Sequence, residues 1–327
     1  MQTTAVRIHR HGGPEVLCIE RIDVAKPAAN EILVRQTAIG LNYSDIYQRA
    51  GEAAGPHAVD NLPITLGSLG AGMITAVGSD VDAFRPGEFV AYLQVGAYAV
   101  DIVVPAARAV PLPKEISAEF AAAWLLRGMT AEYLLRRLYE VKPGDTILVH
   151  AAAGGMGEVL CQWARALGVH VLGTVGSAHK VEIALRKGCD AVVDLSSASL
   201  VDEVVRLTGR RGVDVVYDAV GKDVFLESLE CLRPRGWCVS YGTASGPVGP
   251  FDLQRLHAKS LVVTRPTLRT FIASPSDLQT SARAFFNAVL SGQIRLDIEG
   301  RYPLLDAARA HSDLEGRRTT GASILLP

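Results

Sequence analysis

From Thr146 onward the chain alternates short apolar strands with helices, and this alternation limits the folds that are possible. The pattern predicts strands at Thr146–His150, His170–Thr174, Ala191–Asp194 and Val213–Asp218, with helices at about Gly155–Gly168, His179–Gly188 and Leu200–Thr208. Strands that alternate with helices form parallel sheets covered on both faces, and their crossover connections are right-handed. We therefore expect an α/β domain built on a Rossmann-type, doubly wound parallel sheet.

Between the first of these strands and its helix lies the segment Val149–Gly157, with the sequence Val-His-Ala-Ala-Ala-Gly-Gly-Met-Gly. It is a variant of the glycine pattern that binds a dinucleotide's pyrophosphate at a helix N-terminus, with Ala152 in place of the first glycine. Gly154 would let the backbone approach the pyrophosphate, and Gly157 would let helix and strand pack closely. A tight structural turn is the alternative. The predicted cofactor contacts are Ala153, Gly154, Gly155, Met156 and Gly157.

The end of the second strand indicates which dinucleotide is preferred. Sites that prefer NAD place Asp or Glu here, where the carboxylate accepts a hydrogen bond from the ribose 2′-hydroxyl. The segment Gly173–Lys180 has no carboxylate, whereas Gly176, Ser177 and Lys180 offer room, a hydroxyl and a cation to a 2′-phosphate. NADPH is therefore the expected cofactor, although a solvent-facing Lys180 would give the same sequence.

The remainder of the chain has a different character. The first hundred residues contain short β segments between turn-forming clusters, for example Ala5–Ile8, Glu31–Ala38, Gly72–Val77 and Glu88–Leu93. A helical pattern follows at Ser117–Tyr139, and a helix near Ser276–Ser291 and a strand at Ala322–Leu326 lie near the end. Because 327 residues are about twice a typical domain, we expect a second, mostly β domain.

Composition excludes several classes of partner. The formal net charge is −1, so the chain lacks the basic field of a protein that binds nucleic acid or an anionic membrane. No apolar run reaches membrane-spanning length. The five cysteines are scattered without a Cys-x-x-Cys pair, which is typical of a reducing compartment. We expect a cytoplasmic protein with no membrane partner.

The chain carries several separate motifs in a fixed order: His11–Leu17, Gly40–Tyr47, His150–Gly157, Tyr217–Gly221, Thr264–Pro266 and Arg317–Pro327. Together they resemble the medium-chain dehydrogenase/reductase superfamily, and more closely its zinc-free, zeta-crystallin-like quinone oxidoreductases. The resemblance covers essentially the whole chain. It implies a GroES-like catalytic domain at residues 1–125, a Rossmann NADP-binding domain at 126–264 and a return to the catalytic domain at 265–327.

The resemblance also implies roles for residues near the reacting groups. Asn42 and Tyr47 would lie near the nicotinamide and the substrate and act as the catalytic residues. Tyr241 and Gly242 would line the nicotinamide side. Tyr47 as an ordinary core residue, and Asn42 as the brace of a turn, are the structural alternatives.

Two further cofactor contacts are implied in the same way. Thr130 would contact the cofactor from the helix that links the domains. Arg317 would join Gly176, Ser177 and Lys180 in holding the 2′-phosphate. A turn-bracing Thr130 and a surface Arg317 remain the alternatives.

The positions that hold catalytic zinc in related dehydrogenases lack metal-binding side chains here. Asn42 stands where those relatives have cysteine, and Gly67-Ser68-Leu69 replaces Gly-His-Glu. A catalytic zinc usually takes three thiolate, imidazole or carboxylate ligands, so we predict a metal-free site. Leu69 and the longer loop at 51–62, with His57 and Asp60, are where substrate preference can depart from that of relatives.

A metal-free site, as predicted, limits the substrates that can be reduced. Without a Lewis acid, an unactivated ketone is a poor substrate because nothing strong stabilises the developing alkoxide. A quinone becomes aromatic as its oxygens share the charge, so its reduction needs positioning more than acid catalysis. We expect NADPH-dependent quinone reduction, by hydride or by single electrons. Reduction of the carbon–carbon double bond of an α,β-unsaturated carbonyl is the alternative, and a non-enzymatic NADPH- or RNA-binding role is a third hypothesis. The resemblance implies a homodimer, with Ser260–Thr264 as either a contact strand or an internal strand.

Overall fold

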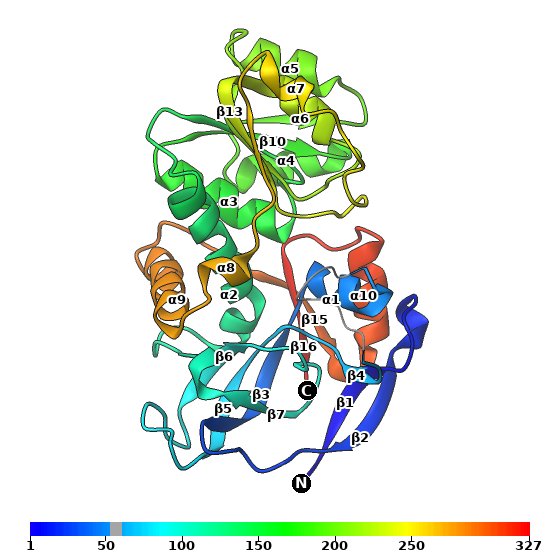
Figure 1. Ribbon diagram of the computed structural model, residues 1–327, viewed down its shortest axis with the longest axis vertical. Coiled ribbons are helices and arrows are strands. Elements are labelled where there is room, and N and C mark those ends of the chain that lie inside the picture. Colours follow the sequence, from blue (N-terminus) through cyan, green and yellow to red (C-terminus); the bar gives the residue numbers. More distant parts are fainter. Residues whose placement is uncertain (53–60) are drawn as a thin grey trace. The chain divides into compact units, whose positions relative to one another are not determined.

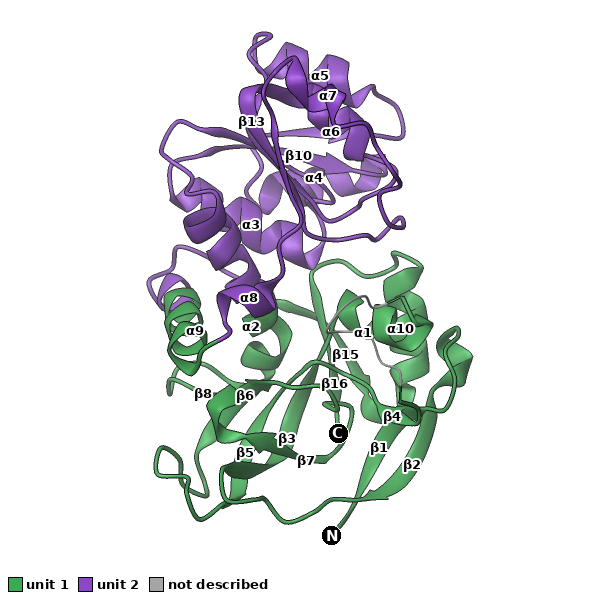
Figure 2. Ribbon diagram, in the orientation of Figure 1, with its two compact units in different colours: residues 1–126, 274–286, 297–327 green, residues 127–273, 287–296 purple. Residues whose placement is uncertain are grey.

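The computed structural model describes residues 1–52 and 61–327, and these form two compact units (Figure 1). Unit 1 comprises Met1–Leu126, Ser274–Phe286 and Asp297–Pro327, and unit 2 comprises Arg127–Ala273 and Asn287–Leu296 (Figure 2). Each unit therefore combines segments that are distant in the sequence. The domain limits expected from the sequence, 1–125, 126–264 and 265–327, stay a prediction.

Unit 1 is built mainly from antiparallel strands. Its larger sheet has the order β15-β16-β3-β5-β6-β8 with β7 beside β3, and a smaller sheet has the order β2-β1-β4. Only β15 and β16 form a parallel pair among the described strands of these sheets. The strands are β1 (Gln2–Ile8), β2 (Cys18–Asp23), β3 (Glu31–Leu41), β4 (Ile64–Thr65), β5 (Leu69–Val77), β6 (Phe89–Leu93), β7 (Asp101–Pro105), β8 (Ala109–Pro111), β15 (Ile298–Pro303) and β16 (Ala322–Leu326).

The helices α1 (Tyr43–Ala50) and α10 (Ala307–Glu315) belong to unit 1. α1 ends where Gly51 adopts a left-handed conformation, with φ 76°. The core of the unit contains apolar side chains from the sheets and from α10, including Ile39 and Ala310. This core holds α10 against the sheets, so the position of that helix is set by apolar burial.

Unit 2 contains a wholly parallel sheet with the order β11-β10-β9-β12-β13-β14. Numbered from β9, this is the 3-2-1-4-5-6 order of a dinucleotide-binding fold, in which the ligand lies at the carboxyl ends of the strands where the order reverses. That reversal falls between β9 and β12. The strands are β9 (Thr146–Val149), β10 (His170–Val175), β11 (Ala191–Asp194), β12 (Val213–Asp218), β13 (Leu232–Ser240) and β14 (Val262–Thr264).

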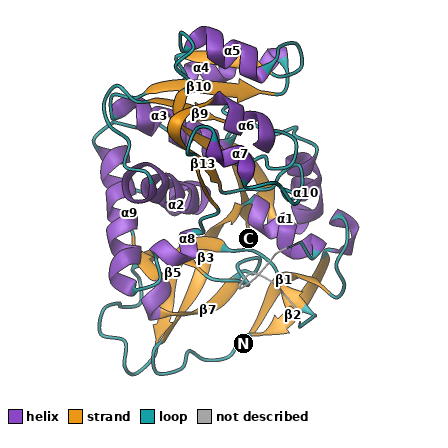
Figure 3. Ribbon diagram, turned by 45° about the horizontal axis from the view of Figure 1, so that its top comes forward, coloured by secondary structure: helices purple, strands orange, loops and turns teal. Residues whose placement is uncertain are grey.

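Helices cover this sheet, as Figure 3 shows for α3, α4 and α6. α3 contacts β9 and β10, α4 contacts β10 and β11, and α5 and α6 contact one another as well as the sheet. The helices are α3 (Gly155–Ala166), α4 (Val181–Arg186), α5 (Leu200–Leu207), α6 (Phe225–Cys231), α7 (Gln254–His257) and α8 (Leu268–Phe271). Two longer helices, α2 (Ala118–Tyr133) and α9 (Pro275–Leu290), contribute residues to both units. None of the helices in the described parts of the chain has the length and apolar character needed to cross a bilayer.

The predicted fold class is confirmed, because a parallel α/β unit accompanies a mostly β unit. Two predicted helices differ in detail. The helix expected at Ser117–Tyr139 ends as an α-helix at Tyr133 and continues as a π-helical turn at Leu134–Leu138. The helix expected from His179 begins at Val181, because a 3₁₀ turn at Ala178–Lys180 precedes it. Short 3₁₀ turns are common at helix N-termini and have no strong sequence signal.

Candidate dinucleotide site and active-site residues

The turn between β9 and α3 is the glycine-rich segment singled out by the sequence. Gly154 is the N-cap of α3, and Gly155, Met156 and Gly157 form its first turn. N–H groups in the first turn of a helix have no intrahelical acceptor and are available to an anion. A Cβ atom on Gly157 would lie 2.6 Å from the carbonyl oxygen of Ala151. Only glycine therefore allows the helix to approach this turn so closely.

His150 supports the same turn from inside unit 2. Its Nδ1 lies 2.9 Å from Thr174 Oγ1 and its Nε2 lies 2.8 Å from Ser228 Oγ. Ser228 donates its hydrogen to the carbonyl oxygen of Val224, so Nε2–H donates to Ser228 and Nδ1 accepts from Thr174. Burial lowers the pKa of His150 to about 4, so the ring is neutral. His150 is thus fixed by two hydrogen bonds directly after β9, and Ala153 in the turn that follows is buried.

The predicted 2′-phosphate residues of unit 2 lie at the carboxyl end of β10. A Cβ atom on Gly176 would meet no described atom within 4 Å, so there is open space beside the backbone. Ser177 is extended (φ −169°) and occupies the N-cap position of the 3₁₀ turn that contains Lys180, where its hydroxyl makes no capping hydrogen bond. β10 pairs with β9, so these residues and the glycine-rich turn follow adjacent strands. The segment supplies a hydroxyl and a cation and no carboxylate, which suits a phosphate.

The carboxyl ends of β12 and β13 hold buried polar atoms that lack hydrogen-bond partners among the described residues. These atoms are Asp218 Oδ2, Ser240 Oγ and Tyr241 Oη. Asp218 and Ser240 are partners in the parallel register, and the Tyr241 N–H donates to the Asp218 carbonyl oxygen at 2.8 Å. Burial raises the pKa of Asp218, against the N–H groups of Gly221 and Val220 that donate to its Oδ1. Unpaired buried polar atoms cost free energy, so a ligand that pairs them gains affinity.

Gly242 lies against the turn that follows β12. A Cβ atom there would lie 2.5 Å from the carbonyl oxygen of Ala219. Arg265 Nη1 donates to the carbonyl oxygens of Ser240 (2.9 Å) and Gly242 (3.0 Å). The contributions of Asp218 and Arg265 were not predicted from the sequence, although both residues lie in motifs that carried the resemblance. The motifs do not show that the Asp218 side chain holds the turn after β12, or that the Arg265 side chain holds the turn after β13.

Thr130 lies in α2, within the part of that helix that belongs to unit 2. It is 9% exposed and is flanked by the buried Met129 and Ala131. Its role toward a cofactor stays a prediction.

The residues present in unit 2 fit a nicotinamide dinucleotide. Three features lie at the carboxyl ends of neighbouring parallel strands. They are the helix N-terminus after β9, the open segment without a carboxylate after β10, and the unpaired polar atoms after β12 and β13. The open-sheet rule places a dinucleotide at this edge.

In unit 1, Asn42 lies at the N-cap of α1 and is 3% exposed. Its amide atoms Oδ1 and Nδ2 have no hydrogen-bond partner among the described residues. Its backbone N–H donates to Asp45 Oδ2 at 2.9 Å, and Asp45 also accepts from Ser68 Oγ (2.7 Å) and Tyr98 Oη (3.3 Å). Burial raises the pKa of Asp45 to about 6, although these hydrogen bonds oppose the increase. The buried carboxyl group fixes the backbone of Asn42 and leaves the amide available.

Tyr47 and Arg317 both lie near Tyr43 in unit 1. The rings of Tyr43 and Tyr47 are 6.0 Å apart and tilted by 49°. Burial raises the pKa of Tyr43 and the neighbouring Tyr47 adds to this, whereas the nearby guanidinium of Arg317 opposes it. The structure therefore brings two predicted site residues of unit 1 close to one tyrosine. Their roles toward substrate and cofactor stay predictions.

The residues at the zinc position of related dehydrogenases do not fit a metal ion. Asn42 offers an amide, Ser68 a hydroxyl bonded to Asp45, and Leu69 is fully buried in β5. Within residues 1–52 and 61–327, no group of three or more His, Cys, Asp or Glu side chains is placed to hold a metal. His57 and Asp60 lie outside the described residues. The amide of Asn42, the hydroxyl of Ser68 and the leucine at position 69 are not the ligands that zinc prefers.

Two family models match the chain. Residues 28–114 match the alcohol dehydrogenase GroES-like domain, and residues 155–287 match the zinc-binding dehydrogenase family. The first match lies within unit 1 and the second lies mostly within unit 2.

Several curated relatives match this chain over nearly its full length and their own. The quinone oxidoreductase of Pseudomonas aeruginosa is 46% identical over 98% of this chain and 99% of its own. The 2-haloacrylate reductase of a Burkholderia species is 40% identical over 99% of this chain and 98% of its own. The crystal structure of Escherichia coli quinone oxidoreductase complexed with NADPH has a TM-score of 0.95 and 44% identity, covering 99% of this chain and all of that one. The chain thus belongs to the quinone oxidoreductase family of the medium-chain dehydrogenase/reductase superfamily.

Proposed function

We propose that this chain reduces quinones with NADPH as electron donor and without a metal ion. The carboxyl edge of the unit 2 sheet carries the proposal, because a helix N-terminus and an open segment without a carboxylate end adjacent strands there. The Escherichia coli quinone oxidoreductase that was solved with NADPH supports it at 44% identity.

Each part of the site has a proposed role in holding the cofactor. Backbone N–H groups in residues 153–157 bind the pyrophosphate, because they lie at the N-terminus of α3. Gly176, Ser177, Lys180 and Arg317 bind the 2′-phosphate. Thr130, Tyr241, Gly242 and Asn42 lie along the nicotinamide side.

Asn42 and Tyr47 act on the substrate. Bound NADPH supplies the reducing electrons, as a hydride in the simplest case. The unpaired amide of Asn42 donates a hydrogen bond to a quinone oxygen and so orients the acceptor. The hydroxyl of Tyr47, or a water molecule, gives the proton that completes the hydroquinone. Little acid catalysis is needed, because aromatisation of the ring stabilises the charge on oxygen.

A second candidate reaction is reduction of an activated carbon–carbon double bond. The 40% identity to a 2-haloacrylate reductase favours it, because an acrylate carries such a bond conjugated to a carboxylate. Leu69 and the loop at 51–62, of which residues 53–60 lie outside the described residues, are the places where this choice of substrate would be made.

We also propose a cytoplasmic homodimer. β14 is an edge strand of the unit 2 sheet, and Val262 within it is 37% exposed. An exposed edge strand with apolar residues is suited to pairing with a second copy. The five cysteines are free thiols, which suits a reducing compartment.

The test is the oxidation of NADPH by p-benzoquinone, beside a simple enone, with NADH and with a chelator in parallel reactions. We expect the quinone to be reduced faster than the enone, with preference for NADPH and no effect of the chelator. Turnover of the enone alone would favour the second candidate. Loss of activity with the chelator would contradict the metal-free site.

The proton-donor role of Tyr47 is tested by Tyr47→Phe. We expect kcat for p-benzoquinone to fall about tenfold while KM for NADPH stays near the wild-type value, because the proposed role of the hydroxyl is toward the acceptor and not toward NADPH. Unchanged turnover would assign the proton to water.

A further inference from the structure

A buried hydrogen-bond network in unit 1 connects α1, which carries Tyr47, with α10, which ends two residues before Arg317. Its centre is Arg49, whose side chain is 2% exposed. Arg49 Nη1 and Nη2 donate to the two carboxylate oxygens of Glu315 at 3.0 and 2.6 Å, and Nε donates to the carbonyl oxygen of Gly12 at 3.0 Å. A paired arginine–carboxylate contact of this kind fixes geometry as well as adding energy.

His311 extends the network toward Asn42. Arg49 Nη1 also donates to His311 Nδ1 at 3.0 Å, and since arginine only donates, Nε2 carries the hydrogen of the neutral ring. Nε2–H donates to Tyr98 Oη at 2.9 Å, and Tyr98 donates to Asp45 at 3.3 Å. Burial lowers the pKa of His311 to about 3, which agrees with a neutral ring. Each hydrogen bond has a defined direction, so Arg49 cannot shift without disturbing its neighbours.

The turn that carries Arg317 is flanked by two ion pairs of different character. Arg317 is left-handed (φ 56°), a conformation that is costly for a residue with a side chain and must be held by its surroundings. On one side, Glu315 is held by the buried Arg49. On the other side, Arg318 contacts Asp313 at 2.8 Å, but the Arg318 side chain is 60% exposed. An exposed pair contributes little, so of the two ion pairs the one with Arg49 is the stronger support. It acts beside the backbone N–H groups of Arg317 and Arg318, which donate to the carbonyl oxygens of Leu314 (3.2 Å) and Asp313 (3.0 Å).

We propose that Arg49 and Glu315 are positioning residues that hold Arg317 ready for a 2′-phosphate and thereby set the preference for NADP over NAD. The proposal rests on the role proposed above for Arg317. A guanidinium whose backbone is already fixed loses less entropy on binding a phosphate than one on a mobile turn. The preference of the chain is then determined in part by residues that do not touch the cofactor.

The experiment is isothermal titration calorimetry of NADP⁺ and NAD⁺ with the full chain. The variants are Glu315→Ala, Glu315→Gln and Arg317→Ala, with Arg318→Met as the matched control from the exposed ion pair. Glu315 suits substitution because its side chain is one-third exposed (34%), and thermal unfolding of each variant is recorded alongside. Affinity measured without turnover separates cofactor recognition from chemistry.

We expect Glu315→Ala to weaken the binding of NADP⁺ about fivefold and the binding of NAD⁺ by less than about twofold. Glu315→Gln is expected to have a smaller effect on NADP⁺ binding. Arg318→Met is expected to leave both affinities unchanged. The positioning proposal is overturned if Glu315→Ala changes the affinities for both dinucleotides by the same factor, or changes neither, while Arg317→Ala removes the preference for NADP⁺. In that case the role of Arg317 stands. If Arg317→Ala keeps the wild-type preference, the proposed role of Arg317 is wrong and the positioning proposal falls with it.

Discussion

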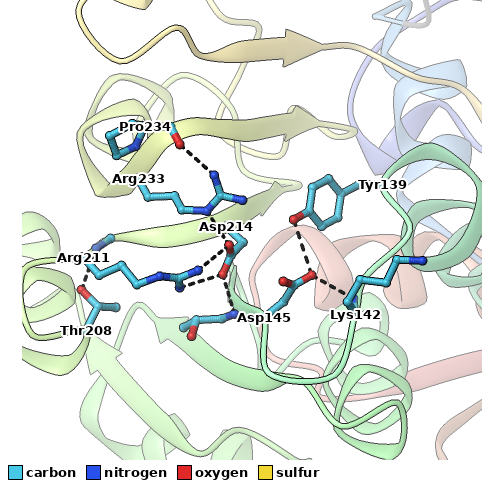
Figure 4. Close-up of polar contacts among 10 residues, drawn as sticks. Tyr139, Lys142, Asp145, Thr208, Arg211, Asp214, Arg233 and Pro234 are labelled. Atoms are coloured by element: carbon cyan, nitrogen blue, oxygen red, sulfur yellow. Dashed lines mark hydrogen bonds and ion pairs between the residues drawn. The ribbon is translucent and has the colours of Figure 1, made fainter.

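Two buried aspartates on strand β12 have opposite surroundings. Asp214 lies at the amino end and Asp218 at the carboxyl end of the same strand, and they are 1% and 0% exposed. Asp214 accepts from both terminal nitrogens of Arg211, from Arg233 Nε and from the Thr146 N–H (Figure 4). These contacts lower the pKa of Asp214 even though burial alone would raise it.

A second group of hydrogen bonds, around Asp145, lies beside this cluster (Figure 4). Asp145 accepts from the backbone N–H of Lys142 at 2.8 Å and from Tyr139 Oη at 3.5 Å (Figure 4). Asp218, in contrast, has an Oδ2 with no partner among the described residues, and burial raises its pKa.

The difference separates a structural edge of the sheet from a binding edge. Polar groups at the amino end pair with one another, so the hydrogen bonds of Asp214 and Asp145 are made within the protein itself. Polar groups at the carboxyl end include three buried atoms that lack partners within the described residues, and a ligand or a water molecule can pair them. Natural proteins accept such costs at functional sites and avoid them elsewhere.

The largest effect is expected at the amino end. Asp214→Ala leaves Arg211 and Arg233 facing one another with no carboxylate between them, so we expect the free energy of unfolding to fall by about 3 kcal/mol. Urea denaturation measures this. Asp202→Ala, which removes an exposed carboxylate from α5, is the control and is expected to have little effect. If Asp214→Ala lowers the free energy of unfolding no more than the control does, the contrast between the two ends of the sheet is wrong.

An intermediate effect is expected from His150, a fully paired group at the carboxyl end. Its pKa is lowered from 6.5 to about 4, so the neutral ring stabilises the fold above pH 6.5 and this contribution is lost as the pH falls toward 4. Between pH 7 and pH 4.5 we expect wild type to lose about 2 kcal/mol more than His150→Asn, in urea denaturation at each pH. Parallel pH profiles would show that His150 is not held neutral.

The smallest effect on stability is expected from Asp218→Asn. Asparagine keeps an oxygen for the Val220 and Gly221 N–H groups and removes a carboxyl group whose charged form is disfavoured by burial. We expect the free energy of unfolding to stay within about 1 kcal/mol of wild type, or to rise. A loss as large as that of Asp214→Ala would mean that Asp218 is also a structural carboxylate.

The sequence predicted the parts of the fold that depend on local pattern. Strands Ala191–Asp194 and Val213–Asp218 match the predicted bounds, because apolar runs between turn-forming residues define them locally. The glycine-rich turn was equally visible, since Gly157 is required by close contact with residues a few positions away.

Long-range contacts were not predictable from one sequence. Arg49 and Glu315 are 266 positions apart, and nothing in either local pattern shows that they pair. The same holds for His150 and Ser228, and for Arg265, whose guanidinium donates to the carbonyl oxygen of Ser240 at the end of a different strand. The roles of Asn42, Tyr47 and Arg317 rest on resemblance, because hydrogen bonding in the protein alone does not specify them.

The most direct test of the central claim, that the carboxyl edge of the unit 2 sheet binds NADPH, is hydrogen–deuterium exchange of the full chain with and without NADPH. We expect exchange to slow in residues 150–157, 176–180 and 240–242, and to stay unchanged in residues 139–145 and 211–214 at the amino edge. Slower exchange at the amino edge alone, or none in residues 150–157 at saturating NADPH, would contradict this account.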